Sequence, residues 1–224
     1  MKWFYSDNRA QRSKWICERF INEIGSCRNL LDVGCSESAI KLYLPGHIDY
    51  KGIDISGNPD YKINLDAIAQ LPFENNQFDI VICADVLEHL ENVHLIFDEL
   101  CRITNKFLIV TLPNPAYGAY RYILRIKYSG QTRESTSYGT YMKFYGLPIE
   151  RPVDRHRWFY GYDEAIRFVE HRTIRNGLKI KSIENNLMFE RIYGLKRIAA
   201  NLLRFFNPNL AYRDIIFVIS RSSC

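Results

Sequence analysis

Acidic residues follow short apolar runs at several points in the first part of the chain. Asp32 precedes Gly34 at the end of one run, and Asp54 and Asp66 each end another. A carboxylate at the end of a strand can accept hydrogen bonds from hydroxyl or amino groups of a ligand. Gly34 tolerates a positive φ and lets a ligand approach the backbone. These residue types and their order predict a site for a polar ligand at one edge of a sheet.

The turn that begins at Gly34 restricts the kind of ligand. Dinucleotide binding requires G-x-G-x-x-G/A, in which the middle glycine lets the pyrophosphate approach the backbone, and Ser36 occupies that middle position. The chain contains no G-x-x-x-x-G-K-[ST] phosphate loop. Backbone N–H groups of residues 36–38, at the start of a helix, suit polar or anionic ligand groups. Asp54 lies about 20 residues after the turn, where an acid can accept both ribose hydroxyls. The pattern favours a nucleoside ligand without phosphates.

Strands and helices alternate around these residues. The apolar run 78–84 is nearly continuous, as in a strand buried on both faces. The alternation predicts a doubly wound α/β fold with a mostly parallel seven-stranded sheet, in a single domain spanning residues 1–224. The expected strands are residues 29–33, 48–55, 61–65, 78–84, 106–112, 178–183 and 212–220, and the expected helices are residues 7–24, 38–44, 92–103, 162–176 and 191–206.

The composition is that of a soluble globular protein, with 47% hydrophobic and 25% charged residues. No apolar run approaches the roughly 20 residues of a membrane span, and residues 1–9 lack a signal-peptide core. We therefore expect a cytoplasmic protein. The six cysteines form no C-x-x-C pair, and no His/Cys cluster has zinc spacing. We expect reduced thiols and no metal site.

The segment 115–160 interrupts the regular alternation. It contains eight basic and three acidic residues, which account for the whole net charge of +5, and it contains eight tyrosines. Such a segment is too long for a simple connection. Its charge and aromatic content suit an anionic small molecule, a lipid or glycolipid phosphate, or RNA held by stacking and charge.

The segment 30–38 resembles the first motif of class I S-adenosylmethionine (SAM)-dependent methyltransferases. Four further segments are similar to motifs of that family and follow in the family's order. Together the similar segments cover residues 30–114, about half the chain. Ser36 and Ser38 stand where glycine is commoner in the family. The further segments are residues 52–56, 64–67 with 71–73, 77–90 and 108–114.

The resemblance implies a Rossmann-like methyltransferase fold, SAM as cofactor, and a lid insertion after strand 5 over residues 115–160. It implies that Asp54 binds the ribose, that Asp66 and the Ala67 N–H bind adenine, and that Asp32 orients the turn or binds the methionine ammonium. Plain helix or turn caps are the alternatives for Asp54 and Asp66. The cofactor-binding residues it implies are Asp32, Gly34, Cys35, Ser36, Ser38, Asp54, Ile55, Asp66, Ala67, Ala84, Asp85 and Val86.

Methyl transfer is an in-line displacement, so the enzyme must hold the nucleophile about 3 Å from the methyl group in a water-poor pocket. A hydroxyl or amine acceptor also calls for a base. His89 is the first candidate, because the pKa of histidine suits the task, and His156 is the second. In the alternative interpretation, Glu88 and His89 cap the following helix and wall the pocket, and His156 lies on a surface loop.

We therefore expect a SAM-dependent methyltransferase that acts on a hydroxyl, amine or carboxyl of a small-molecule or lipid- or saccharide-linked acceptor. An RNA methyltransferase that uses the segment 115–160 and a non-catalytic SAM-binding protein are the alternatives. The basic amphipathic stretch 191–206 packs on the sheet or on a partner, or else lies on an anionic membrane. In the latter case the protein is peripheral at the membrane.

Overall fold

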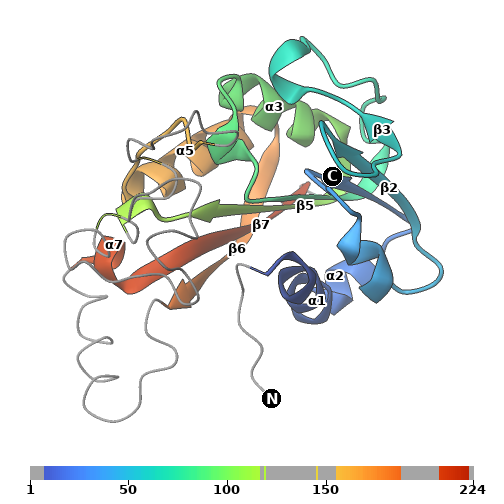
Figure 1. Cartoon of the computed structure of the whole chain (residues 1–224), viewed down its shortest axis with the longest axis horizontal. Coiled ribbons are helices and arrows are strands. Elements are labelled where there is room, and N and C mark those ends of the chain that lie inside the picture. Colours follow the sequence, from blue (N-terminus) through green and yellow to red (C-terminus); the bar gives the residue numbers. More distant parts are fainter. Residues whose placement is uncertain (1–7, 117–118, 120–144, 146–154, 188–206, 222–224) are drawn as a thin grey trace, which may run out of the picture.

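A seven-stranded sheet in the order β3-β2-β1-β4-β5-β7-β6 runs through the computed structural model, which describes residues 8–116, 119, 145, 155–187 and 207–221 (Figure 1). The five strands from β3 to β5 are parallel, and β7 is antiparallel to both β5 and β6. The strands are β1 Asn29–Val33, β2 Asp49–Asp54, β3 Tyr61–Lys62, β4 Phe78–Ala84, β5 Thr104–Pro113, β6 Leu178–Leu187 and β7 Tyr212–Arg221.

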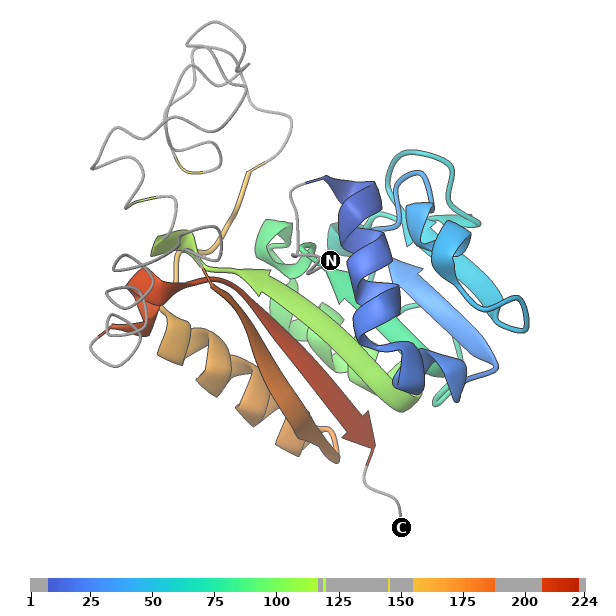
Figure 2. The same ribbon diagram turned by 90° about the horizontal axis from the view of Figure 1, so that it is seen from below.

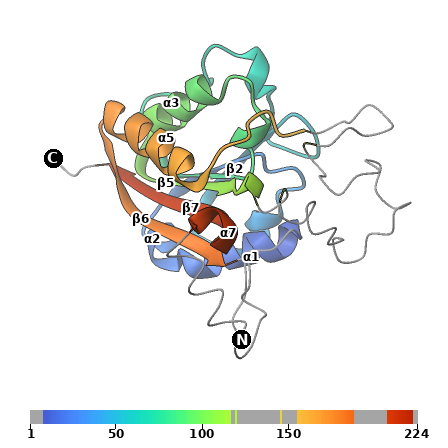
Figure 3. The same ribbon diagram turned by 90° about the vertical axis from the view of Figure 1, so that its left-hand side faces the viewer.

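Helices cover both faces of the sheet. The helices α1 and α2 lie on one face, and α3 and α5 lie on the other, as Figures 2 and 3 show. No helix in the described ranges is long and apolar enough to cross a membrane. The helices are α1 Arg9–Arg19, α2 Ile21–Gly25, α3 Val93–Ile103, α5 Tyr162–Arg175 and α7 Pro208–Ala211, and the 3₁₀ helices are η1 Ala39–Tyr43, η2 Leu65–Ala67 and η3 Leu87–His89.

The predicted fold class is confirmed, whereas several element boundaries differ from the prediction. The single helix expected over 7–24 is divided at Phe20, whose φ of −110° and ψ of 31° end α1. The expected strand 61–65 shortens to Tyr61–Lys62, because β3 is the edge strand and pairs only with β2 among the described strands. The expected strand 178–183 extends to Leu187, because β7 offers a partner along that whole length.

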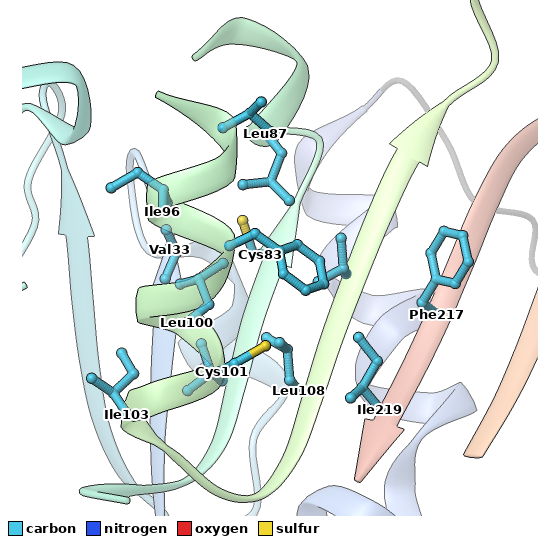
Figure 4. Close-up of a cluster of buried hydrophobic side chains, with 14 of the residues drawn as sticks. Val33, Cys83, Leu87, Ile96, Leu100, Cys101, Ile103, Leu108, Phe217 and Ile219 are labelled. Atoms are coloured by element: carbon cyan, nitrogen blue, oxygen red, sulfur yellow. The ribbon is translucent and has the colours of Figure 1, made fainter. Parts of the chain in front are cut away.

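Two apolar layers hold the helices on the sheet. The alternation of side chains along β4 sends Val81 and Cys83 toward the α3 side, and Ile80 and Ile82 toward the α1 side. Figure 4 shows the α3 layer, in which Cys83 of β4 belongs to the same buried cluster as side chains from α3, β5 and β7. Each such buried side chain contributes about 1.5–3 kcal/mol. Both layers therefore fix the carboxyl ends of the central strands.

The five cysteines of the described part are buried and form no disulfide: Cys17, Cys27, Cys35, Cys83 and Cys101. Most of the segment 115–160 and the whole stretch 191–206 lie outside the described residues. The lid and the amphipathic helix therefore stay predictions.

Candidate active site

The carboxyl ends of β1 and β4 lie next to each other in the centre of the sheet. From β1 the chain proceeds outward to β2 and β3, and then returns to β4 on the other side of β1. Ligands of open α/β sheets bind outside the carboxyl ends of the strands at such a reversal. The turns that follow β1 and β4 touch, because a Cβ added at Gly34 would overlap Val86 Cγ2. The sequence-predicted turn therefore stands at the expected position.

The turn after β1 has a left-handed backbone at three positions. Gly34, Ser36 and Ser38 have φ values of 77°, 50° and 55°. The two serines thus adopt the conformation for which glycine is better suited, at a cost of about 1–3 kcal/mol each. Interactions with the loop after β2 hold this conformation. The Asn58 N–H donates to the Ser36 carbonyl over 3.0 Å, and Gly57 packs so closely on Ser36 that it has no room for a Cβ.

The N–H groups of Ser36 and Ser38 are used inside the protein, which corrects for these two residues the expectation that residues 36–38 offer their N–H groups to a ligand. The Ser36 N–H donates to Asp54 Oδ2 over 2.8 Å. The Ser38 N–H donates to the Cys35 carbonyl over 2.9 Å, and the Gly34 N–H donates to the Ile53 carbonyl over 2.8 Å. The turn is therefore ordered by β2 and its acid rather than by Asp32.

Asp54 orders the turn and can still accept further hydrogen bonds. Its Oδ1 accepts from the Ser56 N–H over 2.9 Å and from the Ser56 hydroxyl over 3.3 Å. A carboxylate has about four lone-pair sites, so acceptor capacity is left for a ligand diol. The next side chain, Ile55, is 58% exposed and offers an apolar surface beside the carboxylate. A carboxylate that can accept hydrogen bonds from hydroxyl groups, next to an apolar surface, suits the ribose and base of a nucleoside.

Asp66 anchors the start of α3. Its Oδ1 accepts from the Asn92 N–H over 3.1 Å, and its carbonyl accepts from the Asn92 side-chain amide over 3.0 Å. The alternative of a turn cap does not apply to Asp66, because the Asn64 side chain caps this turn by accepting from the Asp66 N–H over 3.0 Å. The Ala67 N–H already donates to the Asn64 carbonyl over 3.0 Å. The expected adenine contact through this N–H therefore stays a prediction.

Asp32 is buried beneath the turn. Its Oδ2 accepts from the Tyr50 hydroxyl over 3.2 Å, and the residue is 8% exposed. Burial raises the pKa of Asp32 to about 7, an effect to which the nearby Asp54 carboxylate adds. Tyr50 was not among the residues singled out from sequence. Its place in β2, with two positions between it and Ile53, gives no signal that its hydroxyl reaches a carboxylate on β1.

The turn after β4 is fixed by Asp85, whose φ is 54°. The Thr111 hydroxyl donates to Asp85 Oδ1 over 2.6 Å and accepts from the Asp85 N–H over 2.9 Å. Arg12 on α1 forms an ion pair with Asp85 Oδ2 at 2.6 Å. Arg12 lies 73 positions away in the chain, so no local pattern identifies it. It fastens α1 to the edge of the sheet where the site lies.

The two candidate histidines lie together. The rings of His89 and His156 meet edge to face, with their centroids 4.6 Å apart. Glu88 Oε1 is 3.6 Å from His89 Nε2 and 4.0 Å from His156 Nε2. The Glu88 side chain is 1% exposed, and burial raises the pKa of its carboxyl to about 8. Asn92 occupies the N-cap position of α3, so Glu88 and His89 do not cap that helix.

The segment 155–160 places His156 beside η3. The Arg157 N–H donates to the Glu88 carbonyl over 2.8 Å, and the Trp158 indole donates to the Leu90 carbonyl over 2.7 Å. The Tyr160 hydroxyl donates to the Pro113 carbonyl over 2.8 Å at the end of β5. These bonds make the segment a wall over the carboxyl ends of β4 and β5. The His156 side chain is 6% exposed, so it is not a surface residue.

Comparison with known proteins agrees with this architecture. A family model described as a methyltransferase domain matches residues 31–107. A SAM-dependent methyltransferase from Mesorhizobium loti is 16% identical with a TM-score of 0.56, and the alignment covers 96% of this chain and 99% of that one. The corresponding protein from Archaeoglobus fulgidus is 16% identical with a TM-score of 0.54, covering 95% and 94%.

Magnesium protoporphyrin IX methyltransferase from Synechocystis, solved with bound S-adenosylhomocysteine, is 15% identical with a TM-score of 0.55. The alignment covers 97% of this chain and 91% of that protein. No curated protein matches the sequence. At these identities the solved structures establish the fold, and the family model covers the strands and turns that form the site. Residues 31–107 match a methyltransferase domain, and the chain has the fold of SAM-dependent methyltransferases.

Proposed function

We propose that the protein transfers the methyl group of SAM to a hydroxyl, amine or carboxyl of a small-molecule or lipid- or saccharide-linked acceptor. The observation that carries the proposal is the cluster of Glu88, His89 and His156, which we call the Glu-His-His cluster. It directly follows the turn at Val86, which packs on Gly34 at the cofactor edge. Two imidazoles beside the cofactor turn support proton transfer from an acceptor.

The carboxylates and the apolar side chain at the edge of the sheet fit SAM. The Asp54 carboxylate matches the ribose diol, and the exposed Ile55 side chain matches the adenine face. Asp66 keeps a carboxylate oxygen besides the one bound to Asn92, which matches the adenine amine. Asp32 lies buried under the turn, where the methionine ammonium would favour its ionised form. SAM supplies a methyl group on a sulfonium, which is a good leaving group.

The residues of the chain position the methyl donor and the acceptor, and they take up the proton of the acceptor. The turns after β1 and β4 hold the methyl donor, and the wall formed by residues 155–160 excludes water from the other side. Holding the acceptor atom in line with the methyl group supplies the larger part of the rate enhancement. His89, which is 23% exposed, is the more accessible base for the acceptor proton. His156 lies behind it and positions its ring.

The alternatives have less support. The matches include a small RNA methyltransferase, 17% identical with a TM-score of 0.59, of which this chain covers 27%. The RNA alternative depends on residues 115–160, most of which the structure does not describe. The non-catalytic alternative gives no role to two buried or half-buried histidines beside the cofactor turn. We therefore favour the small or linked acceptor.

Our proposal places the protein in the cytoplasm, with contact to a membrane surface through residues 191–206 as an added feature. The basic amphipathic composition of that stretch supports this contact. Flotation with anionic liposomes, with and without residues 191–206, tests it. Equal flotation of the two forms would remove the membrane contact.

Calorimetric titration with SAM tests the premise. Asp54→Ala should weaken SAM binding by at least about 10–100-fold, because it removes the diol acceptor and the bond that orders Ser36. Asp49→Ala is the matched control, since Asp49 is exposed at the opposite end of the same strand. Equal affinity of both variants and the wild type would contradict the assigned site. Transfer of labelled methyl from SAM into a fractionated cell extract then identifies the acceptor.

A further inference from the structure

The Glu-His-His cluster brings three potential ligand atoms to one point. The ring nitrogens and the carboxylate oxygen all lie within 4.8 Å of one another. The distances of 3.6 Å and 4.0 Å from Glu88 Oε1 to the two Nε2 atoms are longer than hydrogen bonds. They suit two ligands of one ion, because atoms about 2.1 Å from a shared ion are at most about 4.2 Å apart.

The hydrogen-bond partners assign the tautomer of each histidine. His89 Nδ1 lies 3.2 Å from the Arg155 carbonyl, which can only accept, so Nδ1 carries the hydrogen. His156 Nδ1 lies 3.2 Å from the Tyr145 hydroxyl oxygen. That hydroxyl donates its hydrogen to the Trp158 carbonyl over 2.7 Å, so it accepts from His156. The other ring nitrogen, Nε2, lies 3.6 Å from Glu88 Oε1 in His89 and 4.0 Å from it in His156.

Glu88 adds a second, independent observation. Its Oε2 is buried and has no hydrogen-bond partner among the described residues, and the side chain is 1% exposed. A buried carboxyl oxygen without a hydrogen-bond partner is costly. The Glu88 carboxyl and the two Nε2 atoms thus lie together at one place, with Glu88 Oε1 3.6 Å from His89 and 4.0 Å from His156. A cation at this point would satisfy all three groups together.

We propose that the Glu-His-His cluster binds a divalent transition-metal cation and that the methyl acceptor is an oxygen, bound as a hydroxyl at the open coordination positions. Two imidazoles and one carboxylate favour an ion such as Zn²⁺, Mn²⁺ or Fe²⁺ over the all-oxygen sites of Ca²⁺. Three protein ligands leave positions for a substrate, as in catalytic sites. The bonds from Nδ1 to Arg155 and Tyr145 orient the ligands in the manner of outer-shell partners.

This inference rests on the proposed methyl transfer and specifies its chemistry. The ion lowers the pKa of the bound acceptor hydroxyl, and the proton leaves to water. The acceptor oxygen forms a bond to the methyl carbon while the S–CH₃ bond of SAM breaks. The products are the methyl ether and S-adenosylhomocysteine. His89 and His156 then hold the ion instead of accepting the proton.

Titration of the full-length, chelator-treated protein with Co²⁺ tests the inference. The wild type should bind about one Co²⁺ per chain and develop visible d–d bands. His156→Ala and Glu88→Gln should weaken Co²⁺ binding by at least about 10–100-fold. His171→Ala, an exposed histidine of α5, is the matched control and should bind like the wild type. Circular dichroism confirms that each variant is folded, and SAM calorimetry is repeated on all of them.

The outcomes separate the two proposals. Loss of Co²⁺ binding in both cluster variants, with SAM affinity retained, supports the cation site. Wild-type protein that binds SAM but no Co²⁺ overturns the cation site and leaves histidine as the base. Equal Co²⁺ binding by the wild type and both cluster variants also overturns it, because the ion then lies elsewhere. Wild-type protein that binds no SAM overturns the proposed function itself.

Discussion

At the scale of single residues, Asp32 and Asp54 belong to neighbouring strands at one edge of the sheet and have opposite environments. Asp54 is partly exposed and accepts from two backbone N–H groups, which stabilise its charge. Asp32 is 8% exposed and accepts from the Tyr50 hydroxyl. The same side chain therefore serves as a polar anchor at one position and as a buried group that titrates near pH 7 at the other.

The raised pKa of Asp32 predicts a pH-dependent stability. Because the pKa is about 7 in the folded protein, Asp32 binds its proton more tightly there than in the unfolded chain. Its contribution is fully present below the ordinary pKa of 3.8 and is lost as the pH rises to about 7. Asp32→Asn removes this loss, so the variant should gain on the order of 2–4 kcal/mol over the wild type at pH 8.

Urea denaturation of both proteins between about pH 4 and pH 8 measures this difference. The gap in unfolding free energy should widen over that interval. Glu37→Gln, at an exposed position in the same turn, is the control and should follow the wild type. A constant gap between Asp32→Asn and the wild type at every pH would show that Asp32 is ionised throughout.

Gly34 gives a second prediction at this scale. Its φ of 77° disfavours any side chain, and an added Cβ would overlap Val86. Gly34→Ala should lower the unfolding free energy by about 1–3 kcal/mol and abolish measurable SAM binding. Gly25→Ala is the control, since nothing lies within 4 Å of a Cβ there. Similar melting temperatures and SAM affinities for the two variants would argue against the tight contact between the turns.

At the scale of elements, α1 is fastened to the sheet at both ends by ion pairs. Near its start, Arg12 pairs with Asp85, and their side chains are 17% and 18% exposed. At its end, Arg19 donates to Glu184 of β6 over 2.7 Å, with the arginine side chain 53% exposed. The first pair adjoins the turn after β4, and the second lies on the surface. Only the first connects the helix to the site.

This difference predicts unequal effects of two similar substitutions. Arg12→Met should cost about 1.5–3 kcal/mol, because it leaves a partly buried Asp85 carboxylate without its charged partner. Arg19→Met should cost about 0–1 kcal/mol, as is usual for exposed pairs. SAM affinity should fall in Arg12→Met alone. Denaturant titration and calorimetry measure both effects, and an equal loss in the two variants would contradict the special role of Arg12.

At the scale of the whole molecule, two buried layers share one sheet. Leu100 of α3 belongs to one layer and Ile16 of α1 to the other. Their helices lie on opposite faces of the sheet (Figure 3). Since the layers share β1, β4 and β5, neither is expected to unfold alone. This coupling is the physical basis for our prediction of a single domain over residues 1–224.

Leu100→Ala and Ile16→Ala test that coupling. Each should lower the unfolding free energy by about 2–5 kcal/mol, because each leaves a cavity in a fully buried layer. Each should also shift the same single transition, monitored by circular dichroism and by tryptophan fluorescence. Two transitions, one moved by each substitution, would show that the halves unfold independently and would contradict the single domain.

The sequence by itself determined the fold class, the order of strands and helices along the chain, and the position of the turn after the first strand. Periodicity of apolar residues and the conformational needs of Gly34 are local properties, so they can be read from neighbouring residues. Asp54 was identified for the same reason, since a strand end and its acid are contiguous. The short edge strand β3 and the longer β6 were not, because their lengths depend on which partner lies beside them.

The tertiary structure alone decided how distant residues combine. It joined Arg12 to Asp85, paired the Ser36 N–H with Asp54, and brought His156 to Glu88 and His89. Linear spacing in the sequence does not bring Glu88, His89 and His156 together. They meet through hydrogen bonds between η3 and residues 155–160. The orientations of the His89 and His156 rings depend on hydrogen bonds of their Nδ1 atoms to Arg155 and Tyr145, and these bonds exist only once the chain has folded.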